Sequence, residues 1–205
     1  YPQGIKPLLD QPCTVCHSCH HSPCQLKLDS YEGLVRGATK RAIYNSTRLQ
    51  AMDPTRLFMD ADRTREWRDK EFFSVTQNTA AAGLNNSIMV QLLNHKIKNP
   101  KSSGEYRPEA DDLTCAKDGK ELGGFLKKHP TRGMPLGFPP LKQDEFELIA
   151  GWLLQGAKGP TREQQEELVR PKPEDAAALA VWEAFLNTDD AKHAMTARYL
   201  YEHLF

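Results

Sequence analysis

The spacing of apolar residues along the chain predicts two well-formed helices. One stripe follows the helical spacing i, i+3, i+4 and i+7 and consists of Phe146, Ile149, Ala150 and Leu153. A second stripe consists of Ile88, Met89, Leu92, Leu93 and Ile97. Ser87 is a candidate N-cap for the second helix, and Asn99-Pro100 is expected to end it. The helix that carries Phe146 and Leu153 should begin after Lys142, and Gly156 should end it.

Weaker patterns predict further helices toward both ends of the chain. Short ones are expected at 1–12, 31–36, 63–70 and 122–126. Thr161 and Gln164 have the spacing of a capping box, which marks another helix start. Two final helices are predicted at 174–186 and 189–205, with Thr188 as the cap of the second. The chain is therefore expected to be all-α.

One segment departs from helical spacing. Cys24–Leu28 alternates apolar and polar residues, which predicts a short strand and at most one hairpin. Lys plus Arg equals Asp plus Glu, 27 each, so no overall charge draws the chain to nucleic acid. No apolar run reaches the roughly 18 residues of a membrane span, and no leader is visible at Tyr1. Nor does the chain contain a phosphate-binding glycine loop or a Ser-His-Asp arrangement.

Candidate chemistry is concentrated in Cys13-Thr14-Val15-Cys16-His17, which has the C-x-x-C-H spacing of a c-type haem attachment site. Cys13 and Cys16 can add to the two vinyl groups of one haem, and His17 then lies beneath the iron and ligates it. The alternatives are a thioredoxin-like redox pair or half of a zinc site. Neither of them requires a histidine directly after the second cysteine. We therefore expect one covalent haem c per chain.

A second iron ligand is expected from Gly133-Met134-Pro135. Class I cytochromes c supply a methionine from such a loop, and an amphipathic helix follows it, as the 143–156 pattern does here. His129 is the rival for this position, whereas His20 and His21 follow the attachment site too closely to reach the opposite face. Met134 is preferred. The predicted organisation is a cytochrome c-like haem domain over 1–158 with a long insertion, followed by a C-terminal helical extension over 159–205.

The remaining cysteines bear on compartment and disulfides. Covalent haem attachment takes place outside the bacterial cytoplasm, so we expect the periplasm and a leader already removed. Cys19, Cys24 and Cys115 then allow one disulfide and one free thiol. Pairing Cys24 with Cys115 would close the longer loop and restrict the unfolded chain more, so it is preferred, although the sequence leaves the pairing open.

Several segments resemble the bacterial fatty acid cis/trans isomerases. They are Cys13–Cys19 with Pro23–Leu28, Tyr31–Ala38, Asp53–Phe58, Gly133–Pro135 and Arg198–Phe205. The chain departs from that family at Ser18 and His20, where its members mostly carry Gly and Tyr. The resemblance implies a periplasmic haem c enzyme that converts cis double bonds of membrane phospholipid acyl chains to trans. It also implies peripheral contact with a membrane.

Two functions from different classes follow. In the first, a ferric haem withdraws one electron transiently from the double bond, which lowers its bond order until rotation is complete. The alternative is a monohaem electron-transfer cytochrome c, and a redox sensor or peroxidase is a third reading. Arg198–Phe205 favours the isomerase, since a simple carrier has no need of it. Members of the family continue well past this match, so we expect the acyl-chain site and full activity to need that continuation, in the same or a separate chain. No catalytic residue beyond the haem is predicted.

Overall fold

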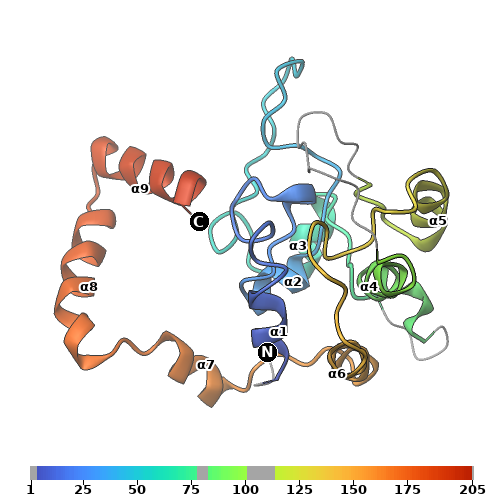
Figure 1. The fold of residues 1–205 in the computed structure, drawn as a ribbon. Helices are drawn as coiled ribbons and strands as arrows, with labels where there is room; N and C mark the ends of the chain where they lie inside the picture. Colours follow the sequence, from blue (N-terminus) through green and yellow to red (C-terminus); the bar gives the residue numbers. More distant parts are fainter. Residues whose placement is uncertain (1–3, 78–82, 101–113, 205) are drawn as a thin grey trace. The chain divides into compact units, whose positions relative to one another are not determined.

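The computed structural model describes residues 4–77, 83–100 and 114–204 (Figure 1). It divides into two compact units, Tyr1–Gly159 and Pro160–Phe205, which are described separately. Within the described ranges the regular structure is helical, and an isolated antiparallel bridge joins Ala38 and Phe73. The prediction of an all-α protein is confirmed at this level.

The first unit contains six α-helices and two 3₁₀ turns in its described part. In chain order they are α1 (Ile5–Asp10), η1 (Pro23–Gln25), α2 (Tyr31–Arg36), α3 (Thr64–Asp69), η2 (Leu84–Asn86), α4 (Ile88–Lys98), α5 (Gly119–Lys128) and α6 (Gln143–Leu154). Helix α6 packs against both α1 and α4. Their apolar stripes meet in one core, which includes Ile5, Leu9, Leu34, Leu93, Ile149 and Leu153. This core holds the segments after α1 and before α6 in place.

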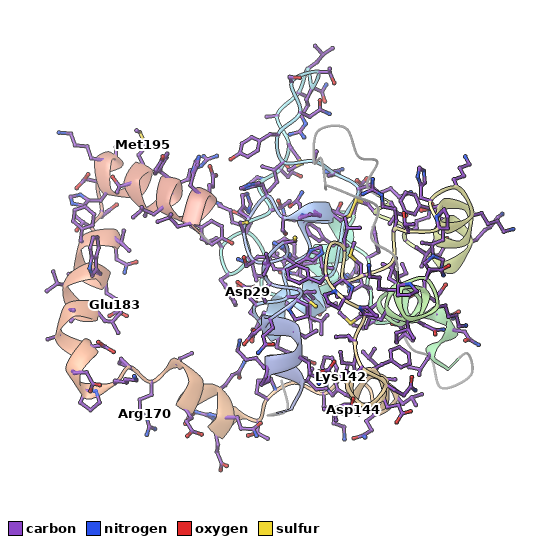
Figure 2. All side chains as sticks on the ribbon, viewed as in Figure 1. Asp29, Lys142, Asp144, Arg170, Glu183 and Met195 are labelled. Atoms are coloured by element: carbon purple, nitrogen blue, oxygen red, sulfur yellow. A yellow bond between two sulfur atoms is a disulfide. The ribbon has the colours of Figure 1, made fainter. Side chains whose placement is uncertain are left out.

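The predicted helix boundaries around α4 and α6 are confirmed, and the caps explain them. The Ser87 hydroxyl accepts a hydrogen bond from the Val90 N–H at 3.2 Å and so satisfies one of the free donors at the start of α4. At α6 the Lys142 side chain offers no cap, and the Glu145 carboxylate instead accepts from the Lys142 N–H at 2.8 Å. Figure 2 labels Lys142 at this helix start. Gly156 follows the end of α6 with φ of 88°, a conformation that favours glycine.

The prediction of a short strand at Cys24–Leu28 is wrong. Pro23–Gln25 forms the turn η1, and Cys24 and Gln25 have φ of 56° and 51°, which no strand contains. The backbone of this segment bonds to separate partners instead of to one neighbouring strand. The Leu28 N–H donates to the His17 carbonyl at 2.7 Å, and the Thr39 N–H donates to the Cys24 carbonyl at 2.9 Å. Alternation of apolar residues here reflects burial beside the core, not a sheet.

The second unit consists of α7 (Arg162–Val169), α8 (Pro173–Leu186) and α9 (Ala191–Leu204). The capping box of Thr161 with Gln164 is confirmed at the start of α7. Thr188 as the cap of α9 is wrong, because its hydroxyl donates to the Ala184 carbonyl of α8. Asp190 caps α9 instead, because its carboxylate accepts hydrogen bonds from the Lys192 and His193 N–H groups. Met195 projects from α9 into solvent (Figure 2).

Candidate functional site

An apolar cavity of about 320 Å³ lies in the first unit, and residues of α1, α4 and α6 are among those that line it. Its volume lies in the usual range of ligand pockets. Four residues that the sequence singled out line this cavity: Cys13, Cys16, His17 and Met134. Cys13–His17 and Met134 are far apart in the chain, so it is the fold that brings them together at this cavity.

The attachment motif continues directly from α1. The Cys13 N–H donates to the Leu9 carbonyl at 3.0 Å, and the Cys13 carbonyl accepts from the Cys16 and His17 N–H groups at 3.2 and 2.9 Å. This single turn places both thiols beside one imidazole. Both cysteines are free thiols in the structure.

The Cys13 thiol differs from the nucleophilic thiol of a redox-active pair. Burial, with Cys16 as a smaller cause, raises the pKa of the Cys13 thiol to about 11. Thioredoxin-like pairs have the opposite property, since their nucleophilic thiol has a lowered pKa. The environment of Cys13 therefore disfavours a thiolate, which counts against the redox-pair interpretation.

The His17 ring is held in one tautomer. Its Nδ1 lies 3.1 Å from the Leu26 carbonyl oxygen, and because a carbonyl oxygen only accepts, Nδ1 carries the proton. Burial lowers the pKa of His17, and the hydrogen bond to Leu26 opposes that effect more weakly. The neutral ring then has its free lone pair on Nε2. This is the form and the orienting contact typical of a metal-ligating histidine.

Met134 reaches the cavity on a loop that is packed tightly against α4. Its N–H donates to the Leu92 carbonyl at 3.2 Å. A Cβ added at Gly133 would lie 2.6 Å from the Lys96 backbone nitrogen, so only glycine fits at this crossing. His129, the rival ligand, caps the end of α5 with its ring centroid 4.7 Å from that of Phe125, and it is not among the cavity residues. Ligation itself stays a prediction.

The prediction that Cys24 pairs with Cys115 is confirmed by a disulfide between them. Both half-cystines line the cavity, and Cys19 is free. The bond therefore ties η1 to the segment before α5 at the edge of the candidate site. It closes a loop of 91 residues, which favours the folded chain by restricting the unfolded one.

A buried arginine supports the segment that orients His17, and no sequence pattern predicted it. Arg36 is fully buried, and it donates to the carbonyls of Gln25 and Thr55. The Thr55 hydroxyl in turn donates to the Gln25 side chain at 2.6 Å. The guanidinium also lies over the Phe72 ring, 4.9 Å from its centroid. These contacts fix the backbone just before the Leu26 carbonyl.

Ser22 is a second contributor that sequence reasoning missed. Its hydroxyl donates at 2.8 Å to the same Leu26 carbonyl that accepts from His17. A main-chain oxygen has no side-chain signature, so no pattern could have identified it as the partner of His17. Only the tertiary fold brings these three groups together.

The donor set in the cavity fits a haem c. Two adjacent thiols, an imidazole with a free Nε2 and a methionine thioether face one apolar space. These are the groups that attach and ligate such a haem. The lining is otherwise apolar, as a flat hydrophobic macrocycle requires.

The fold and the cavity together define an all-α protein with one apolar cavity among the helices of its first unit. The family model for fatty acid cis/trans isomerase matches residues 52–205. The chain belongs to the fatty acid cis/trans isomerase family, and the resemblance found in the sequence is confirmed. It is thus an isomerase of fatty acyl chains, and the match includes Met134 but begins after the Cys13–His17 motif. No curated protein and no solved structure is significantly similar to the chain.

None of the helices in the described part of the chain combines the length and the apolar character needed to cross a bilayer.

Proposed function

We propose that this chain holds the haem c site of a periplasmic cis/trans isomerase, one that acts on unsaturated acyl chains of membrane phospholipids. The observation that carries the proposal is the convergence of Cys13, Cys16, His17 and Met134 on one apolar cavity. The family of the chain supplies the reaction and the acyl substrate. The electron-transfer cytochrome, the alternative drawn from the sequence, has no support from that family match.

Each of these residues has a distinct role in the proposal. Cys13 and Cys16 would form the thioether bonds to the haem, and His17 Nε2 and the Met134 thioether would hold its iron. The order of α1, the attachment motif, the methionine loop and α6 is typical of class I cytochromes c. We therefore propose that the first unit is cytochrome c-like, with the segment between His17 and Met134 as its elaboration.

The chemistry needs no net oxidation, because the cis and trans chains have the same composition. A haem bound there would supply a one-electron acceptor for a reversible withdrawal of charge from the double bond, and ligation by the Met134 thioether would favour this by raising the potential. The chain's own part is to hold the site rigid and dry. His17 is fixed through Leu26, Met134 is fixed through Leu92, and the apolar lining excludes water.

The first test is spectroscopic. Protein exported to the periplasm should give a pyridine haemochrome spectrum of c type and a mass that includes one haem. The double variant Cys13→Ala, Cys16→Ala should lose the covalent haem. A wild-type chain that matures without haem would refute the haem site.

The second test separates the two candidate ligands and then links them to activity. The ferric protein should show a weak near-infrared sulfur-to-iron band, which Met134→Ala removes and His129→Ala retains. Conversion of palmitoleoyl phospholipid to the trans isomer, followed by gas chromatography in the complete enzyme, should fall in Met134→Ala and not in His129→Ala. Activity that survives complete loss of haem would overturn the electron-withdrawal chemistry, and the reverse pattern of bands would identify His129 as the ligand.

A further inference from the structure

Positive charge is concentrated at the C-terminal ends of α4 and α5. The stretches 84–98 and 122–143 contain no Asp or Glu, although the whole chain has 27 acidic and 27 basic residues. Lys98 ends α4, Lys127 and Lys128 end α5, and all three are exposed. The half-buried Arg132 follows in the loop that leads to Met134. We call Lys98, Lys127, Lys128 and Arg132 the basic patch.

Contacts between distant segments bring the members of the basic patch together. Leu92 of α4 and Leu126 of α5 pack against one buried cluster, so the second halves of the two helices lie beside each other (Figure 1). At the end of α4 the His95 Nε2–H donates to the Pro130 carbonyl at 2.6 Å. Arg132 lies two residues further along the same loop. The patch is therefore one region of the first unit, built from two helix ends and a loop.

The charge of the basic patch exceeds what the helix ends themselves can use. A helix dipole places about half a negative charge at its C-terminus, so two helix ends offset about one of the four positive charges. None of the salt bridges among the described residues includes Lys98, Lys127 or Lys128. The carboxylate of α5 itself, Glu121, pairs with Lys40 at 2.8 Å. An excess of about three positive charges is thus left for an external anion.

We propose that the basic patch is a docking surface for the phosphate groups of an anionic phospholipid bilayer. Charge complementarity favours this occupant, since lysine and arginine side chains bind phosphate and are attracted to anionic membranes. Its position favours it too, because Met134, two residues after Arg132, lines the apolar cavity. A bilayer bound at the patch lies beside the loop that carries the candidate iron ligand. In naming a phospholipid, the inference rests on the proposed function, whose substrate is a membrane acyl chain.

Vesicle binding by the haem-loaded chain tests the patch. Wild-type protein should sediment with vesicles of phosphatidylcholine and phosphatidylglycerol in equal parts, and it should not sediment with vesicles of phosphatidylcholine alone. The triple variant Lys98→Gln, Lys127→Gln, Lys128→Gln should bind the anionic vesicles about a hundredfold more weakly at low salt, because each cation near such a surface strengthens binding about fivefold. Replacing the same three residues by arginine should preserve binding. High salt should release the wild type, since it screens surface charges.

A second triple variant is the matched control. Lys40→Gln, Lys117→Gln, Lys120→Gln removes the same charge from exposed lysines around Glu121, at the other end of α5. This variant should bind anionic vesicles almost as tightly as the wild type. Circular dichroism checks that every variant is folded.

Three results would overturn the inference. They are wild-type binding that does not require phosphatidylglycerol, equal losses of binding in the two glutamine variants, and a wild type that does not bind anionic vesicles at all. The second result would show that net charge alone is responsible. The third would leave an acidic protein as the partner of the patch.

Failure of this inference differs from failure of the haem site. Vesicle binding can also be measured with protein that carries no haem. A chain that matures without haem and still binds anionic vesicles through the patch would refute the haem site alone. A haem-loaded chain that ignores these vesicles would refute the docking surface alone.

Discussion

Replacing Gly133 by alanine should loosen the methionine loop, because the new methyl group has no room. Its Cβ would meet three atoms of Lys96, the backbone nitrogen at 2.6 Å, Cα at 2.8 Å and Cβ at 2.9 Å. Two of these atoms are backbone within α4, so no side-chain rotation relieves the clash. Overpacking of this kind costs about 1–3 kcal/mol. The loop should move away from α4 and weaken the bond from the Met134 N–H to the Leu92 carbonyl.

The assay is thermal unfolding together with the near-infrared band of the ferric protein. For a chain of this size each kcal/mol lowers Tm by about 2–4 °C, so Gly133→Ala should melt about 2–12 °C lower and should lose part of the band. Gly124→Ala is the matched control, since its Cβ would meet nothing within 4 Å inside α5. That change should stabilise the chain by about 0.5–1 kcal/mol. A Gly133→Ala protein with the wild-type Tm and an intact band would refute this account of the loop.

Three other changes test the supports of the cavity. Cys24→Ser with Cys115→Ser opens a 91-residue loop and should cost about 2–5 kcal/mol in urea unfolding, an effect that prior reduction of the wild type should reproduce. Arg36→Met leaves two buried carbonyls without their donor and should cost about 1–3 kcal/mol for each, whereas the exposed Arg162→Met should be close to neutral. In protein produced without haem attachment, alkylation of the Cys13 thiol by iodoacetamide should be slow at pH 8. The rate should rise up to about pH 11, because burial raises the pKa of this thiol to about 11. Fast alkylation of Cys13 at pH 8 would contradict its burial.

Much of the helical framework follows from local sequence. Helix α4 begins at Ser87 because the hydroxyl of that residue caps the next turn, and α6 carries its apolar stripe on the face that meets α1. Such signals involve residues a few positions apart, so they act before any tertiary contact forms. The C-x-x-C-H motif is local in the same sense, since a single turn after α1 sets its geometry.

What the tertiary structure decided depends on contacts between distant segments. The turn η1 replaces the expected strand because none of the residues that the structure describes forms a strand beside it, and backbone groups of Cys24–Leu28 bond to His17 and Thr39 instead. Met134, and not His129, reaches the cavity because Gly133 allows its loop to cross α4 closely.

Contacts between distant segments also explain why no sequence pattern could have revealed the roles of two further residues. Lys96 occupies a lysine-rich helix end that in sequence is typical of a solvated surface, yet it is fully buried in the fold, where Gly133 crosses α4 closely at this residue. Leu26 serves His17 through its main-chain oxygen, which every residue possesses. The sequence by itself thus determined much of the helical framework and the C-x-x-C-H motif. The packing of α4, α6 and the methionine loop determines which groups surround that motif. Burial and hydrogen-bond partners exist only once the chain has folded around its core.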